Sequence, residues 1–200
     1  RPGADAETVL TTQGRPISPD DEIRVLDLED GPPVPDGQAG APAVRGPYTF
    51  RGYYRSPAHN AQAFDAEGFY HSGDLVVRRA DGYLRVVGRI KDQINRGGEK
   101  IAAEEVEALL LRHPAIRQAA LIALPDASMG ERSVAVIVSD AALKPSALRR
   151  HLSAAGLASY KLPDQFRSLD ALPLTPIGKT DKRRLRALLD EQDQKEGALT

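Results

Sequence analysis

Residues 88–107 read GRIKDQINRGGEKIAAEEVE, and this stretch decides how the chain is organised. Its first half predicts two short strands on either side of the glycine pair Gly97-Gly98. Its second half opens an amphipathic helix at Ala103–His113. Strands and turns dominate before the stretch, whereas strands and helices mix after it. We therefore place a boundary between two units at Gly88–Asp92.

The part of the chain upstream of the boundary carries frequent turn signals. Alternating apolar and polar residues predict a strand at Glu22–Leu28, and aromatic residues predict another at Phe50–Tyr54. A proline-led helix is expected at Pro57–Phe64. The segments around Asp81-Gly82 predict a hairpin, because Asp-Gly is a strong turn signal. Residues 1–88 are therefore expected to form a small β-rich unit.

The part downstream of the boundary alternates between apolar runs, which predict strands, and amphipathic or charged stretches, which predict helices. The predicted strands are Gln118–Leu124, Ser133–Val138 and Gln165–Leu169, and the predicted helices are Ser146–Ala155 and Asp181–Glu191. No repeating βαβ unit is visible, so the expected fold class is α+β.

Composition excludes several kinds of protein. The 200 residues carry 27 basic and 28 acidic side chains, so no bulk field favours nucleic acid or an anionic membrane. No cysteine is present, which excludes disulfides and thiolate metal sites. The four histidines are scattered without metal-binding spacing, and no metal site is predicted. No signal peptide or long apolar run is found, so we expect a cytoplasmic chain without membrane contact.

Four short segments hold more glycine and charge than a scaffold needs. Asp74 follows a glycine at a predicted strand start, where a carboxylate can accept hydrogen bonds from a vicinal diol. Arg89 offers a planar donor fork and Lys91 a flexible charge. The glycine pair Gly97-Gly98 allows close approach of another chain. Lys179 stands on a glycine-flanked loop. Each segment also has a plain explanation as a turn, a solvated linker or a basic helix end.

The segment Gly178-Lys179-Thr180 superficially matches the end of a phosphate-binding P-loop. That motif needs a glycine five residues before Gly178, and position 173 is proline. The segment is therefore not a P-loop.

The order and spacing of the four segments resemble the C-terminal part of the acyl-adenylating superfamily, which includes acyl-CoA synthetases, peptide-synthetase adenylation domains and luciferases. The run at residues 88–107 is most similar to the form found in stand-alone 2,3-dihydroxybenzoate–AMP ligases of siderophore synthesis. Segments 45–54, 68–70 and 12–19 point to the same branch. The resemblance extends from about Thr12 to Leu189.

The resemblance implies a domain arrangement. Residues 1–88 would be the last β-rich subdomain of a large N-terminal domain, residues 89–91 a hinge, and residues 92–200 a mobile lid. The chain begins at Arg1 without methionine, and we expect it to be part of a longer protein whose N-terminal domain holds the phosphate loop and acid pocket. The fragment alone is expected to be inactive. Pro42 departs from the family pattern and predicts local looseness of its strand.

The resemblance also implies roles for individual residues. Asp74 would bind the ribose hydroxyls and Arg89 the ribose and phosphate region, while Lys91 would be the hinge residue. Lys179 would bridge the attacking carboxylate and the α-phosphate. The remaining implied residues would line a channel for a phosphopantetheine arm, and they are Asn95, Gly97, Gly98 and Lys100.

The implied reaction uses ATP and Mg²⁺ to form an aryl-AMP, with 2,3-dihydroxybenzoate as the first choice of acid. The aryl group would then pass to the phosphopantetheine thiol of an aryl carrier protein. Three alternatives stay open: a salicylate- or other benzoate-activating ligase, an amino-acid adenylation domain of a peptide synthetase, and, for the fragment alone, a non-catalytic module that docks a carrier protein.

Overall fold

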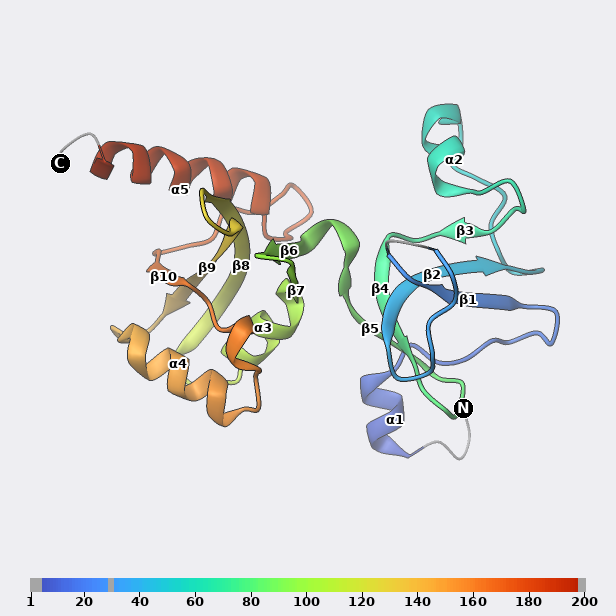
Figure 1. Ribbon diagram of the computed structural model, residues 1–200, viewed down its shortest axis with the longest axis horizontal. Helices are drawn as coiled ribbons and strands as arrows, with labels where there is room; N and C mark the ends of the chain where they lie inside the picture. Colours follow the sequence, from blue (N-terminus) through green and yellow to red (C-terminus); the bar gives the residue numbers. More distant parts are fainter. Residues whose placement is uncertain (1–4, 29–30, 198–200) are drawn as a thin grey trace. The chain divides into compact units, whose positions relative to one another are not determined.

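The computed structural model describes residues 5–28 and 31–197 (Figure 1). The chain divides into two compact units, Arg1–Lys91 and Asp92–Thr200. The 3₁₀ turn η1 (Ile90–Asp92) contains the point of division. Both units combine helices with sheets, which confirms the α+β class.

The first unit is built around an antiparallel sheet. Its strands are β1 (Glu22–Leu26), β2 (Ala39–Arg45), β3 (Tyr70–His71), β4 (Asp74–Arg78) and β5 (Leu84–Arg89). The strands follow the order β1-β2-β4-β5, with β3 also paired to β2. The predicted hairpin around Asp81-Gly82 is confirmed as β4 and β5. Val25, Val34 and Val76 form a small buried cluster on this sheet.

Two short helices accompany this sheet, α1 (Ala6–Thr11) and α2 (Pro57–Ala63). The second helix was predicted, whereas α1 was missed. Asp5 caps α1 because its side chain accepts a 2.8 Å hydrogen bond from the Thr8 N–H. A helix of this length has too few residues to show a helical period.

The predicted strand at Phe50–Tyr54 is wrong, because the described backbone there is a loop. The side chain of Asn60 takes the place of a neighbouring strand. Its Oδ1 accepts from the Tyr53 N–H at 2.7 Å, and its Nδ2 donates to the Tyr53 carbonyl at 3.0 Å. The aromatic residues that suggested a strand instead pack against one another.

The predicted looseness at Pro42 is also wrong, because β2 is a regular paired strand. Residues 41–45 pair with β1, Ala39-Gly40 pair with β4, and Ala43-Val44 pair with β3. Pro42 lies between the segments that β3 and β4 pair, so its missing N–H leaves the sheet intact at this point.

The second unit contains a five-stranded sheet and three α-helices. Its strands are β6 (Gln93–Arg96), β7 (Glu99–Ala102), β8 (Ile116–Asp126), β9 (Gly130–Ser139) and β10 (Gln165–Ser168), and its helices are α3 (Ala103–Leu110), α4 (Pro145–Ala154) and α5 (Lys182–Gly197), with a 3₁₀ turn η2 (Ser159–Lys161). The sheet has the order β10-β9-β6-β7, and β8 also pairs with β9. All pairs are antiparallel except β10 with β9. The strands and helices predicted for this unit are confirmed, with shifted ends.

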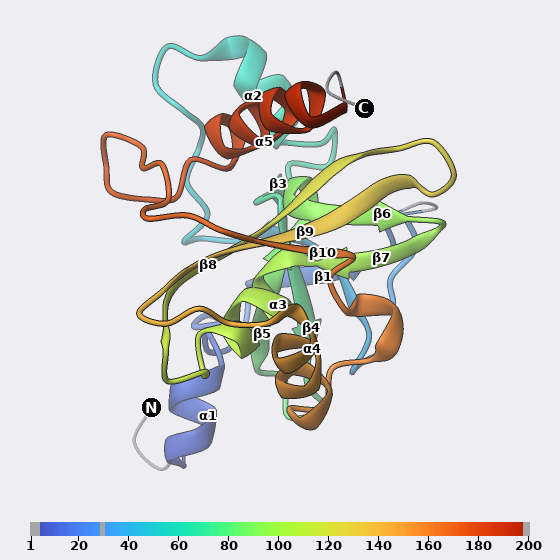
Figure 2. The same cartoon turned by 90° about the vertical axis from the view of Figure 1, so that its left-hand side faces the viewer.

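Helices cover both faces of this second sheet. In Figures 1 and 2, α5 lies on one side of the sheet while α3 and α4 lie on the other. Ala135 and Ile137 of β9 pack with Val106 and Leu148 from α3 and α4. The alternate β9 residues pack with α5, and the cluster they form includes Val134, Val136, Val138, Leu185 and Leu189. The continuous apolar run in β9 is therefore explained by burial on both faces.

Candidate functional site

Asp74 and Arg89 lie next to each other at one end of the first sheet. Asp74 begins β4, Arg89 ends β5, and the two residues are paired across the strands. The Arg89 Nε is 3.2 Å from Asp74 Oδ1, and the side chains are 51% and 27% exposed, respectively. The structure therefore places side by side the two residues that the family resemblance assigns to the nucleotide.

The backbone around this pair is specified by local sequence. Gly73 has a φ of +75°, which suits glycine, and its carbonyl accepts from the Ile90 N–H at 3.0 Å. A β-bulge follows between Leu75 and Val76. Bulges turn strand ends and re-aim side chains, so the two charged groups project at the end of the hairpin.

Tyr70 lies close to Asp74, and its contribution was missed in the sequence. The hydroxyls of Tyr70 and Tyr53 are 3.1 Å apart. This hydrogen bond, burial and the nearby Asp74 charge together raise the pKa of Tyr70 to about 12. The Tyr70 ring also packs edge-on against Phe50 at 4.7 Å. Tyr70 begins the segment that was singled out around Asp74, and Tyr53 lies in segment 45–54 of the resemblance, but neither residue was given a role.

A depression of about 310 Å³ lies beside this aromatic group. It is lined by Asp21, Glu22, Ile23, Val44, Arg45, Tyr48, Thr49, Phe50 and Tyr70. Of the residues predicted from the sequence as functional, none is in this lining.

Lys91 is exposed within the 3₁₀ turn η1, at the last position of the first unit. The predicted glycine turn follows in the second unit, between β6 and β7. Arg96 pairs with Glu99, and Asn95 pairs with Lys100, so the turn itself is Gly97-Gly98. Both glycines have positive φ, +59° and +91°, as a tight hairpin requires.

The two glycines meet different surroundings. A Cβ on Gly97 would lie 2.5 Å from Met129 Cε, whereas one on Gly98 would meet nothing within 4 Å. The Gly97 N–H also donates to the Met129 carbonyl at 2.8 Å. Glycine at 97 therefore suits the positive φ, and any larger side chain there would also have to displace the flexible end of Met129.

Lys179 lies on a tight loop of the second unit that precedes α5. The Thr175 N–H donates to the Lys179 carbonyl at 2.7 Å, and the Lys179 N–H donates to Thr175 Oγ1 at 3.1 Å. Asp181 then caps α5, since its Oδ1 accepts from the Arg184 N–H at 2.9 Å. The Lys179 side chain is exposed, and among residues 5–28 and 31–197 its amine has no hydrogen-bond or ion-pair partner. A fixed backbone thus presents an uncompensated cation.

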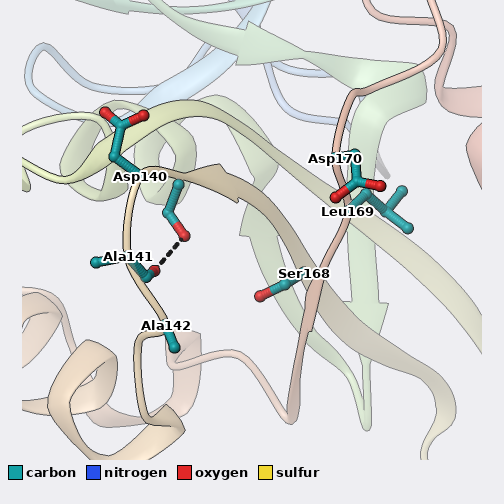
Figure 3. Close-up of a pocket in the computed structure, with 7 residues that line it drawn as sticks. Asp140, Ala141, Ala142, Ser168, Leu169 and Asp170 are labelled. Carbon is teal, nitrogen blue, oxygen red and sulfur yellow. Dashed lines mark hydrogen bonds between the residues drawn. The ribbon is translucent and has the colours of Figure 1, made fainter.

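A second depression, of about 330 Å³, opens on the second unit (Figure 3). It is lined by Ser139, Asp140, Ala141, Ala142, Ser168, Leu169 and Asp170. Ser139 Oγ donates to the Ala141 carbonyl at 2.8 Å, and Asp140 pairs with Arg117 at 2.9 Å. The sequence predicted none of these residues as functional; Ser139 is bonded within the lining, and Asp140 is paired with a residue outside it.

The described residues form neither a metal-binding cluster nor a membrane-spanning helix. In the described part of the chain, no group of three or more histidine, cysteine, aspartate or glutamate side chains could hold a metal ion. Over the same residues, no helix has the length and apolar character needed to cross a membrane.

Comparison with known proteins gives consistent matches. The profile of the AMP-binding enzyme C-terminal domain matches residues 105–179. The chain is 59% identical over 188 residues to pseudomonine synthase PmsE of Pseudomonas entomophila, covering 94% of this chain and 31% of the relative. It is 56% identical over 191 residues to the vibriobactin-specific 2,3-dihydroxybenzoate-AMP ligase of Vibrio cholerae, covering 92% and 34%.

The structure is also similar to a solved one. It matches o-succinylbenzoate CoA synthetase (MenE) of Bacillus subtilis, in complex with the acyl-adenylate intermediate OSB-AMP, with a TM-score of 0.79 and 30% identity. The match covers 88% of this chain and 36% of that one. The chain spans about a third of the length of the curated relatives that it matches.

Proposed function

Because the chain belongs to the 2,3-dihydroxybenzoate–AMP ligase-like aryl-acid adenylating enzymes, whose C-terminal region it matches, we propose that the full-length protein activates an aryl acid with ATP. The aryl group then passes to the phosphopantetheine thiol of a carrier protein in siderophore biosynthesis. The proposed acid is 2,3-dihydroxybenzoate, and salicylate is the alternative.

The observation that carries the proposal is the exposed Lys179 amine on its hydrogen-bonded loop. In the first half-reaction a carboxylate oxygen of the acid attacks the α-phosphorus of ATP, and the bond to pyrophosphate breaks. Negative charge accumulates on the phosphoryl oxygens and is stabilised by fixed cations. Lys179 has no counter-ion among the described residues, so its charge is available to bridge the attacking carboxylate and the α-phosphate.

Asp74 and Arg89 would hold the nucleoside part of the same molecule. The Asp74 carboxylate would accept hydrogen bonds from the ribose hydroxyls, and the Arg89 fork would donate to ribose and phosphate oxygens. Neighbouring Tyr70 stays uncharged at neutral pH and adds no competing charge. Mg²⁺ would accompany ATP, and no cluster among the described residues fits the ion.

The second half-reaction forms a thioester. The pantetheine sulfur attacks the carbonyl carbon of the aryl-AMP, the carbon–oxygen bond to AMP breaks, and the thiol proton is released. We assign the Asn95–Lys100 turn, with Gly97 and Gly98 at its tip, to the channel for the pantetheine arm. Lys91 would be the hinge about which the second unit moves between the two half-reactions.

Acid-dependent exchange of pyrophosphate into ATP tests the first half-reaction. The full-length protein is offered 2,3-dihydroxybenzoate, salicylate, benzoate and a mixture of amino acids. We expect exchange with a hydroxybenzoate and a loss of at least about 100-fold in Lys179→Ala, the scale of removing one preorganised donor. Lys144→Ala, another exposed lysine of the second unit, is the matched control and should retain exchange.

The other possible outcomes of the exchange experiment would support different functions or contradict the role of Lys179. Exchange with amino acids alone would assign the protein to the peptide-synthetase branch. Binding of a holo carrier protein without exchange for any acid would support a docking module instead. Full exchange in Lys179→Ala would contradict the role given to this lysine.

A further inference from the structure

The residue before the glycine turn, Arg96, is held by a carboxylate from a distant part of the second unit. Arg96 Nε lies 2.9 Å from both carboxylate oxygens of Asp164, and its Nη2 lies 2.8 Å from Oδ1. This is a charge-assisted contact with fixed geometry. It ties the end of β6 to the residue that precedes β10.

Asp164 is itself anchored in the interior of the unit. Its Oδ2 accepts from the Ser133 N–H at 2.8 Å and from Ser133 Oγ at 3.0 Å, and Ser133 is fully buried in β9. The Arg149 guanidinium of α4 donates to the Asp164 carbonyl at 2.7 Å. The Asp164 carboxylate therefore links β6 to β9, and its backbone carbonyl adds a contact with α4.

The other side of the turn rests on the hairpin between β8 and β9. The Gly97 N–H donates to the Met129 carbonyl at 2.8 Å, and the Asn95 N–H donates to Glu131 Oε2 at 2.7 Å. That hairpin is closed by Asp126, whose Oδ1 accepts from the N–H groups of Ser128 and Met129. A two-glycine turn is conformationally permissive, and these contacts restrict it from both sides.

We propose that Arg96 and Asp164 are positioning residues for the thioester-forming half-reaction. They hold the Asn95–Lys100 turn in one conformation, so the pantetheine thiol meets the aryl-AMP carbonyl in a reactive geometry. The inference rests on the proposed function, which gives this turn to the pantetheine channel. A displacement of about 1 Å at such a site can cost about 100-fold in rate. Adenylation does not use the turn and should not depend on the clamp.

The test compares the two half-reactions in the full-length protein carrying Asp164→Asn. The amide keeps the size of the side chain but removes its charge and turns an NH₂ towards Arg96 or Ser133, which are both donors. We expect pyrophosphate exchange to stay within about twofold, while single-turnover aryl transfer to a holo carrier protein slows about tenfold or more. The KM for the carrier should change little, because the effect is on kcat.

Asp140→Asn is the matched control. It makes the same change to an ion pair of the same unit, but Arg117 and Asp140 are 60% and 61% exposed and do not touch the turn. Neither half-reaction should change. If Asp164→Asn fails to fold, Arg96→Lys retains the charge without the bidentate fork and should show a smaller loss of transfer alone.

Three results would overturn the inference. Transfer at the wild-type rate in both variants would show that the clamp does not position the turn. An equal fall in both half-reactions, in step with a lower Tm, would assign the clamp to stability only. If the wild-type protein shows no exchange with any aryl acid, the proposed function fails and the inference fails with it.

Discussion

At the scale of single residues, Gly97 combines a backbone requirement with a packing requirement. An alanine there must adopt positive φ, which costs about 1–2 kcal/mol, and must also displace the Met129 methyl group. We expect Gly97→Ala to lower the free energy of unfolding by at least this amount in a denaturant titration. In a Met129→Ala background, the free-energy cost of Gly97→Ala should fall to the part that comes from the positive φ alone. Equal costs in both backgrounds would show that the Met129 contact is unimportant.

Tyr70 gives the first unit a pH dependence at the alkaline end. Its hydrogen bond with Tyr53 raises the pKa of Tyr70 to about 12, above the ordinary value of about 10. The folded state therefore prefers the neutral phenol. This stabilisation is fully present below about pH 10 and is lost as the pH rises towards 12.

Tyr53→Phe removes the partner hydroxyl and should bring the pKa of Tyr70 closer to its ordinary value. We expect the Tm of the variant to fall less steeply than that of the wild type between about pH 10 and 12. Tyr54→Phe is the control, since Tyr54 is 86% exposed and lacks this hydrogen bond. If the Tm of Tyr53→Phe falls with pH as steeply as that of the wild type, the Tyr53 hydrogen bond does not raise the pKa of Tyr70.

At the scale of elements, one ion pair joins α5 to α3 in the second unit. Lys182 Nζ is 2.8 Å from Glu107 Oε1, and the side chains are only 17% and 16% exposed. The same Glu107 oxygen accepts from the Leu121 N–H of β8 at 2.7 Å. Lys182 begins the helix that follows the Lys179 loop, so the pair fixes the end of that loop to the core.

Removing the cation alone should be costly because it leaves a largely buried carboxylate unpaired. We expect Lys182→Met to lower the free energy of unfolding by about 3 kcal/mol. The double variant Lys182→Met with Glu107→Gln should recover much of this, since the amide oxygen can still accept from Leu121. The exposed pair offers a comparison: Arg117→Met should cost less than about 1 kcal/mol. Similar costs for Lys182→Met and Arg117→Met would refute the argument.

Elements were predicted well where their pattern reflects burial. The apolar run of β9 and the Asp-Gly hairpin of the first unit were both found, because each is specified within a few residues. The Phe50–Tyr54 segment has the composition of a strand, yet Asn60 satisfies its backbone and no strand forms. Composition alone cannot distinguish a strand partner from a side chain that replaces one.

The residues of the candidate site also divide into those marked by local sequence and those brought together only by the tertiary fold. Asp74, Arg89 and Lys179 could be proposed from the sequence because glycines and charges mark their segments locally and the family resemblance gives them roles. Asp164 could not be found, because it is 68 residues from Arg96 along the chain and lies outside any motif. The partner of Tyr70 is 17 residues away, in a loop. Supporting contacts of this kind depend on the tertiary fold.

At the largest scale, Lys91 is the proposed hinge of the full-length protein. Proline at this position fixes φ near about −65° and should restrict rotation of the chain there. We expect Lys91→Pro in the full-length protein to keep pyrophosphate exchange while slowing aryl transfer to the carrier. Lys91→Ala, which leaves the backbone free to rotate, should support both half-reactions. Normal transfer by the proline variant would place the hinge elsewhere.

The central position of β9 also determines how the second unit fluctuates. This strand is paired on one side with β8 and on the other with β10, and both of its faces are covered by helices. Its amide hydrogens can exchange with solvent only when much of the unit opens, whereas the exposed Lys179 side chain can change rotamer while its loop stays closed. The lysine can therefore sample new positions many times within the lifetime of an intact sheet, so local motion at the site need not endanger the fold.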